Sequence, residues 1–113
     1  MKIPEEGQLL RIFIGESDRY ESRPLYEWIV IKAKEAGLAG ATAWRGIMGF
    51  GTNSRIHTTK IMRLSEDLPV IIEIVDTADK LKTFLGVIDT VIGEGLATLE
   101  KADIQFYRSS KKQ

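Results

Sequence analysis

Short apolar or alternating stretches of the chain predict four β-strands. Residues 8–14 place three aliphatic side chains on one side and Leu9, Arg11 and Phe13 on the other, which is the two-residue period of a strand. The run from residue 70 to 75 is apolar almost throughout, as in a strand that is buried on both faces. The predicted strands are residues 8–14, 39–48, 70–75 and 102–107.

Two longer stretches have apolar residues at helical spacing instead. The first follows Pro24, which suits the first turn of a helix because an N–H there would have no partner, and it ends at Gly37, a typical C′ residue. The second begins with a capping residue and carboxylates at residues 76–79 and ends at Gly93. Its apolar stripe consists of Leu81, Phe84, Leu85, Ile88, Val91 and Ile92.

These elements follow one another in the order β-α-β-β-α-β. This order predicts an α+β, ferredoxin-like fold, in which a four-stranded antiparallel sheet carries both helices on one face. The opposite face would present Leu9, Phe13, Trp44 and one side of the 70–75 strand, which together are too apolar to stay in water. We therefore expect a second copy of the chain to cover that face.

The length of the chain predicts one domain that spans residues 1–113. Residues from about 52 to 66 are polar and have poor periodicity, so we expect a long loop there, with a possible short strand near residues 60–64. A loop of this length in a small domain is usually functional or mobile. The polar residues 109–113 predict a frayed tail.

Charge and composition narrow the class of protein. Sixteen basic and sixteen acidic residues give a formal net charge of zero, which argues against a general nucleic-acid or membrane surface. The absence of cysteine excludes disulfides and thiolate chemistry, and it fits a reducing compartment. No stretch resembles a signal peptide or a membrane span, so we expect a cytoplasmic domain without membrane insertion.

The sequence offers little for catalysis or metal binding. His57 is the only histidine, and triad chemistry needs partners that no spacing in the chain indicates. One histidine and scattered carboxylates do not make a spaced set of metal ligands. We therefore expect no catalytic residue, no metal site and no required cofactor. A small phosphate-processing enzyme that uses His57 stays as an alternative.

Two glycine turns are the best candidates for a binding site. Gly49-Phe50-Gly51 follows the second predicted strand, and Gly93-Glu94-Gly95 follows the second predicted helix. Successive backbone N–H groups in such turns form concave sites for anions such as phosphate. Each turn alone is a weak indication of a binding site, because Gly-x-Gly is common in turns. Gly93 would also serve equally well to end the helix.

In combination with their neighbours, these turns resemble the PII signalling proteins, and more closely the small PII-like family. Residues 37–42 (GLAGAT) are similar to the Gly-Ile-x-Gly-Met-Thr of that family, and residues 49–51 to the Gly-Phe-Gly that opens its T-loop. Residues 68–75 (LPVIIEIV) are similar to its Leu-Pro-Lys-Val-x-Ile-Glu-Ile-Val strand, and residues 93–95 to the Gly-Asp-Gly of its phosphate-binding B-loop. The four motifs occur in the family's order over nearly the whole chain.

The resemblance implies a homotrimer that binds an adenine nucleotide (ADP, ATP or AMP) in clefts between subunits. It places Gly49, Phe50, Gly51, Gly93, Glu94 and Gly95 at the nucleotide, with Arg108 as a C-terminal arginine for its phosphates. It also implies that residues of about 52–66 act as the loop that signals to a protein target. Such a protein would be regulatory and not an enzyme.

Three departures from the PII pattern change the expectations. The stretch between Thr42 and Gly49 is one residue longer than in PII. The loop contains no tyrosine, so uridylylation of a loop tyrosine is not supported. Leu96 stands where the B-loop carries a phosphate-binding lysine, so ATP should bind more weakly than ADP or AMP. The alternative from another class is a trimer of similar fold that binds a divalent metal or a small metabolite.

Overall fold

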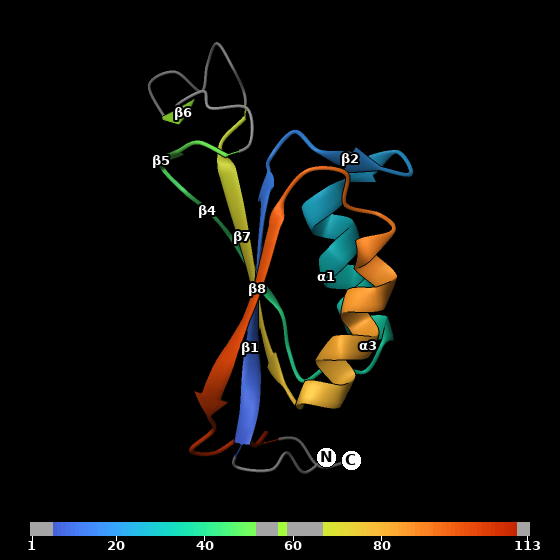
Figure 1. Ribbon diagram of the computed structural model, residues 1–113, viewed down its shortest axis with the longest axis vertical. Coiled ribbons are helices and arrows are strands. Elements are labelled where there is room, and N and C mark those ends of the chain that lie inside the picture. Colours follow the sequence, from blue (N-terminus) through green and yellow to red (C-terminus); the bar gives the residue numbers. More distant parts are fainter. Residues whose placement is uncertain (1–5, 52–56, 59–66, 111–113) are drawn as a thin grey trace.

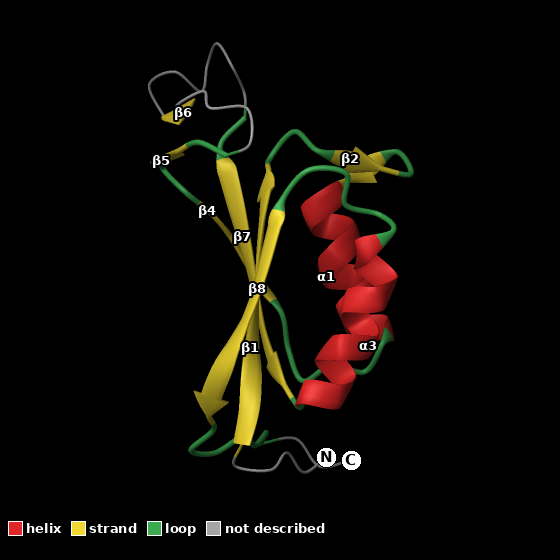
Figure 2. Ribbon diagram, in the orientation of Figure 1, coloured by secondary structure: helices red, strands yellow, loops and turns green. Residues whose placement is uncertain are grey.

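The computed structural model describes residues 6–51, 57–58 and 67–110, and its main elements follow the predicted β-α-β-β-α-β order (Figures 1 and 2). The long elements are β1 (Glu6–Gly15), α1 (Leu25–Glu35), β4 (Thr42–Arg45), β7 (Pro69–Asp76), α3 (Ala78–Asp89) and β8 (Leu96–Asp103). The short ones are β2 (Arg19–Tyr20), β3 (Arg23–Pro24), β5 (Met48–Gly49) and β6 (His57–Thr58).

The main sheet has the strand order β4-β7-β1-β8, and each neighbouring pair is antiparallel. Figure 1 shows α1 and α3 side by side on one face of this sheet. The predicted ferredoxin-like fold is therefore confirmed. The register also defines the two ends of the sheet: Gly15 pairs with Pro69 at one end, and Glu6 pairs with Asp103 at the other.

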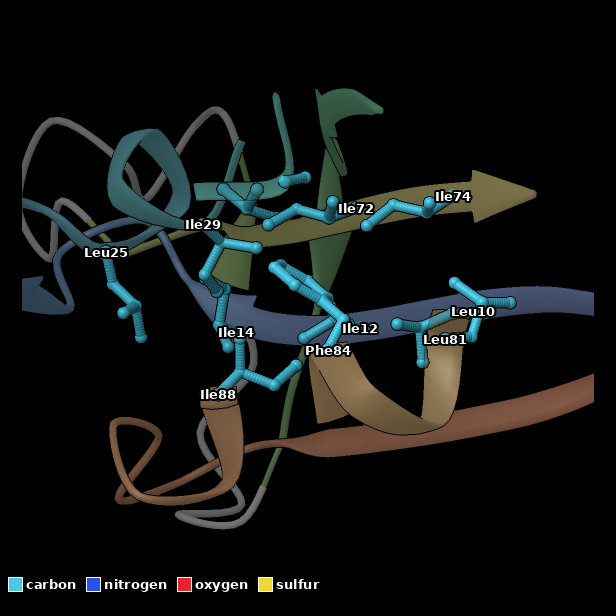
Figure 3. Close-up of a cluster of buried hydrophobic side chains, with 12 residues drawn as sticks. Leu10, Ile12, Ile14, Leu25, Ile29, Ile72, Ile74, Leu81, Phe84 and Ile88 are labelled. Atoms are coloured by element: carbon cyan, nitrogen blue, oxygen red, sulfur yellow. The ribbon is translucent and has the colours of Figure 1, made fainter. Parts of the chain in front are cut away.

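The core lies between the sheet and the two helices (Figure 3). Alternate residues of β1 and β7, such as Leu10, Ile12 and Ile72, point toward the helices and are fully buried. Phe84 and the other stripe residues of α3 pack against them, as the helical period predicts. Each large side chain buried in this way contributes about 1.5–3 kcal/mol to stability.

The other face of the sheet, which we call the open face, has no layer over it within the described chain (Figure 2). Trp44 is 51% exposed there and Leu96 58%, and Phe13 pairs directly with Leu96. An ion pair between Arg11 Nε and Glu73 Oε2, 2.8 Å long, crosses its centre. This pair accounts for Glu73, the charged residue in the middle of the otherwise apolar run from residue 70 to 75.

The helix ends largely follow the predicted signals. Pro24 occupies the N-cap position of α1, and Gly37 follows its C-cap with φ of 78°. Thr77 caps α3 by accepting a hydrogen bond from the Lys80 amide. Asp76, which we expected to be an ordinary capping or loop residue, is fully buried at the end of β7. Its carboxylate accepts hydrogen bonds from the amides of Ala39 (2.8 Å) and Thr77 (2.7 Å).

The last predicted strand was placed too late in the chain. The sequence pattern indicated residues 102–107, whereas β8 spans Leu96–Asp103. Pairing with β1 sets its length, because β1 begins at Glu6 and the ladder ends where Glu6 meets Asp103. Beyond that point no partner strand is present among the described residues.

The predicted strand at residues 39–48 is shorter and divided. β4 ends at Arg45, and after a bend at Ile47 the separate β5 pairs with β6. Pro69 begins the neighbouring strand, and a proline has no N–H with which to extend the ladder. Instead its carbonyl accepts a 2.7 Å hydrogen bond from the Gly46 amide. The strand predicted near residues 60–64 lies outside the described residues.

A small hairpin, β2–β3, occupies what the sequence indicated only as a turn. Its two central residues, Glu21 and Ser22, have φ of 53° and 68°, the left-handed conformation that a tight hairpin of this kind requires. Tyr20 packs edge-on against Trp28 of α1, with 5.0 Å between ring centroids. This ring contact packs the hairpin against the helix layer. None of the helices in the described residues has the length and apolar character of a membrane span.

Candidate functional site

A cleft of about 210 Å³ lies at the end of the sheet where Gly15 meets Pro69. Four connections of the chain converge there: the end of β1, the turn after β5, the approach to β7 and the turn between α3 and β8. The described lining residues are Phe13, Ile14, Gly15, Asp18, Gly49, Phe50, Gly51, Asp67, Leu68, Pro69, Glu94, Gly95 and Leu96. Both predicted glycine turns therefore contribute to one cleft, although they are far apart in the sequence.

The glycines in this cleft differ in whether their surroundings leave room for a side chain. A Cβ at Gly95 would lie 2.8 Å from the carbonyl oxygen of Phe13, and its φ is 156°. A Cβ at Gly49 would lie 3.0 Å from Cγ of Pro69, whereas one at Gly51 would meet nothing within 4 Å. The close approach of backbone segments thus requires glycine at residue 95 but not at residue 51.

Two of the predicted site residues are not among the lining residues of the cleft. Gly93 lies on a neighbouring groove of about 420 Å³ between the end of α3 and the start of β8. Arg108 lies beyond the far end of β8, where its guanidinium is 4.2 Å from the centre of the Phe106 ring. Because β8 has eight residues, roughly 26 Å of strand separates that end from the cleft.

The region around Arg108 is attached to the connection that precedes β4. The Tyr107 hydroxyl donates a 2.8 Å hydrogen bond to the carbonyl of Ala39. Ala39 belongs to the stretch 37–42, which is the Gly-Leu-Ala-Gly-Ala-Thr motif. The predicted site residues therefore lie at opposite ends of the sheet: the glycine turns at one end, and Arg108, beside the 37–42 motif, at the other.

Three carboxylates from separate segments line the cleft, namely those of Asp18, Asp67 and Glu94. Asp18 accepts a 3.0 Å hydrogen bond from the Gly15 amide, and Asp67 accepts one of 3.1 Å from the Ser17 amide. Glu94 is exposed. No lysine, arginine or histidine is among the described lining residues.

Burial raises the pKa of Asp18 above its ordinary range. The negative charges of Asp67 and Glu94 raise the pKa further, while the hydrogen bond from the Gly15 amide opposes both effects. Asp18 thus interacts unfavourably with the other two carboxylates of the cleft. In the described residues we found no group of three or more histidine, cysteine, aspartate or glutamate side chains that could hold a metal ion.

A charged pair lies next to the cleft. Arg45, at the end of β4, donates from Nη1 to Oε2 of Glu16 over 2.9 Å, and Glu16 directly follows the cleft residue Gly15. The other carboxylate oxygen of Glu16 is buried without a hydrogen-bond partner. The arginine nearest in sequence to Gly49 is thus already engaged by a carboxylate. The side chain of His57, the candidate for catalysis, lies outside the described part of the structure.

Comparison with known proteins places the chain in a family. The model of the DUF190 family, described as "Uncharacterized ACR, COG1993", matches residues 7–104. The chain belongs to the DUF190 family. A UPF0166 protein of Aquifex aeolicus is 40% identical over 99 residues, which cover 86% of this chain and 91% of the relative. A UPF0166 protein of Methanocaldococcus jannaschii is 36% identical over 80 residues, covering 71% and 73% of the two chains.

Solved structures extend the comparison to the PII-like proteins. This DUF190 chain superimposes with a TM-score of 0.66 on CPII, a nitrogen regulatory PII-like protein from Thiomonas intermedia K12, solved with ADP, AMP and bicarbonate. Sequence identity is 16%, and the match covers 91% of this chain and 90% of CPII. A second CPII structure, with ADP and bicarbonate, gives a TM-score of 0.64 at 16% identity over the same shares of the two chains. The PII-like resemblance of the DUF190 chain is therefore confirmed at the level of the fold.

Sequence reasoning missed the lining residues of the DUF190 cleft that come from the end of β1, the turn after it and the approach to β7, among them the two charged residues Asp18 and Asp67. Both aspartates fall in polar stretches where aspartate is common for local reasons, and no pattern in the sequence indicates that the two stretches meet. The closeness of Gly15 to Pro69 in the sheet brings them together. Leu96, noted as the residue in place of a lysine, does line the cleft, next to Gly95.

Proposed function

We propose that this DUF190 protein is a PII-like regulatory protein that binds an adenine nucleotide in clefts between subunits. It performs no chemistry on the nucleotide, and it transmits occupancy to a protein target through the segment of residues 52–66. The observation that carries the proposal is the meeting of Gly49–Gly51 and Glu94–Gly95 on one cleft, because such turns present backbone N–H groups to phosphate. The ADP and AMP held by the structural neighbour CPII support the same ligand class.

The position of Arg108 supports a site shared by two subunits. One chain cannot bring this arginine to its own glycine turns, since they lie at opposite ends of the sheet. A second copy can supply it, and the open face, with Trp44 and Leu96 exposed, gives the copies a reason to associate. We propose a homotrimer in which each nucleotide contacts the glycine turns of one subunit and Arg108 of the next.

The route to a partner follows from where the signalling segment is attached. Gly51 and Asp67, the residues on either side of the segment 52–66, both line the cleft. A nucleotide that changes the spacing of these two residues therefore acts on both ends of the segment at once. This is the kind of coupling by which a ligand orders a loop.

The first test is isothermal titration of the protein with ADP, ATP, AMP and cyclic AMP, with the oligomer mass measured on the same sample. We expect saturable binding of one nucleotide per subunit in a trimer. Arg108→Ala should weaken binding about tenfold or more, because it removes a charged hydrogen-bond donor. Arg23→Ala, which changes an exposed arginine of β3, is the matched control and should leave affinity unchanged. A folded protein that binds none of the four nucleotides would refute the proposal.

A mixing experiment tests whether the site is shared. Gly51→Asp adds a negative charge at a position with open space, so it should block phosphate without harming the fold. We expect neither Gly51→Asp nor Arg108→Ala to bind well alone. Co-expressed, they should form mixed oligomers in which some clefts combine an intact Gly51 with a neighbour's intact Arg108, and part of the binding should return. No recovery in mixed oligomers would mean that Gly51 of one subunit and Arg108 of the next do not meet in a shared cleft.

A further inference from the structure

The cleft is an unusual place for a polyphosphate, because its described walls carry three carboxylates and no basic side chain. Asp18 comes from the turn after β1, Asp67 from the approach to β7 and Glu94 from the turn before β8. Backbone amides can hold one phosphate group there as neutral donors. Each further phosphate charge, however, is added against three fixed negative charges.

We propose that Asp18, Asp67 and Glu94 act as an electrostatic filter that ranks nucleotides by the charge of their phosphates, with AMP favoured over ADP and ADP over ATP. This inference rests on the proposed nucleotide site and names the property that decides which nucleotide that site takes. Partly screened repulsion from three carboxylates amounts to about a threefold to tenfold loss of affinity for each added phosphate charge. The filter acts in addition to the missing lysine at Leu96.

The three carboxylates differ in the hydrogen bonds that they accept from the protein. Asp18 and Asp67 bind backbone amides of the β1–β2 connection, so their removal would also loosen the wall of the cleft. Glu94 is exposed, and no hydrogen bond or ion pair holds it within the described chain. Glu94→Gln therefore removes the charge alone. Asp18→Asn removes a charge but keeps an oxygen that can accept from the Gly15 amide.

The affinity for nucleotide should depend on pH through Asp18, and the direction of this dependence follows from the pKa shift. The pKa of Asp18 is raised by burial and by the charges of Asp67 and Glu94, against the opposing hydrogen bond from Gly15, and a phosphate beside it would raise the pKa further. Binding therefore takes up a proton, so affinity rises as the pH falls toward the pKa of Asp18. Two described arginines near this part of the chain do not reverse the sign: Arg45 is paired with Glu16, and Arg19, which follows Asp18 in the sequence, donates to the carbonyl of Ser22.

The test is a set of titrations with AMP, ADP and ATP at low ionic strength and without divalent cations. We expect the ratio of the Kd for ATP to the Kd for AMP to fall about twofold to fivefold in Glu94→Gln and in Asp18→Asn, because each variant removes one of the three charges that repel the two added phosphate charges. Glu27→Gln, a matched loss of one charge at an exposed residue of α1, should keep the ratio of the unaltered protein. Asp18→Asn should also lessen the rise in affinity between pH 7 and pH 5 that remains after the phosphate's own titration is accounted for.

The outcomes separate the two proposals. If nucleotides bind but the ratio is the same in all variants, the filter is wrong and the nucleotide site stands. If the unaltered protein binds no nucleotide at all, the proposed function fails and the filter fails with it. Should Asp18→Asn not fold, Glu94→Gln decides the question, because the Glu94 side chain is exposed and has no hydrogen bond or ion pair with the described residues.

Discussion

Gly93 and Gly95 belong to one turn, but their surroundings differ in the space that they leave for a side chain. A Cβ added at Gly95 would lie 2.8 Å from the Phe13 carbonyl oxygen, which is backbone and cannot turn aside. A Cβ added at Gly93 would meet nothing within 4 Å. The fold itself thus requires the second glycine of the turn and leaves the first free for substitution.

We predict that Gly95→Ala lowers the free energy of unfolding by about 2 kcal/mol or more, because the clash is with backbone and the φ suits glycine. Gly93→Ala should change it by less than about 0.5 kcal/mol. Urea denaturation followed by circular dichroism measures both. Equal losses in the two variants would mean that the turn does not have the described geometry.

At this scale the sequence identified the right residue types but not their individual roles. The Gly-x-Gly pattern pointed to both glycines equally, since the atom that makes Gly95 necessary belongs to β1, more than eighty residues earlier. The same limit applies to Asp18 and Asp67. Their chemistry as a pair exists only because the register of β1 with β7 puts Gly15 beside Pro69.

Asp76 joins three elements at the end of β7 that is remote from the cleft. Its buried carboxylate accepts from the amide of Ala39, ahead of β4, and from the amide of Thr77, the cap of α3. One side chain therefore fixes the position of the connection between α1 and β4 relative to the start of α3.

We expect Asp76→Ala to cost about 2–4 kcal/mol of stability, because it leaves two partly buried amides without an acceptor and opens a cavity. Asp79→Ala is the matched control: that carboxylate is exposed in the first turn of α3, and its loss should cost less than about 1 kcal/mol. Thermal unfolding of the two variants gives the comparison. If Asp76→Ala unfolds with the same midpoint as Asp79→Ala, the two hydrogen bonds accepted by Asp76 do not contribute to stability.

Elements with a local pattern were predictable, and elements defined by a partner were not. The stripe of α3 indicated its buried residues because a helix contains its own hydrogen bonds. β8 lacks such a pattern, since its side chains are largely exposed at the edge of the sheet, and β1 sets its limits through pairing. The more regular alternation at residues 102–107 therefore misled the interpretation.

For the whole molecule, the open face gives a prediction about assembly. Trp44→Asp should reduce the oligomer to smaller species, because it places a charge in the apolar surface that we propose a second copy covers. Stability of the single chain should change little, since Trp44 is 51% exposed in it. Val87→Asp, on an exposed position of α3, is the control. Light scattering measures the masses, and an unaltered mass for Trp44→Asp would place the contact between copies elsewhere.

The overall architecture could be predicted because the order of elements allows few arrangements. The sequence did not reveal that the predicted site residues separate into two groups at opposite ends of the sheet. That separation follows from the path of β8, which begins beside the cleft at Leu96 and carries the chain away from it before Arg108 is reached.

The strand order also determines when the sheet can form during synthesis. β1 precedes both of its neighbours in the described sheet, β7 and β8, so it stays without them until residue 76 is made. At about 5–20 residues per second, that wait lasts roughly 3 to 12 s. Throughout this time an apolar strand with two open edges is available to other nascent chains. A chain that stops before Leu96 keeps one of those edges open permanently, so premature termination would yield a product prone to aggregation and not a smaller folded domain.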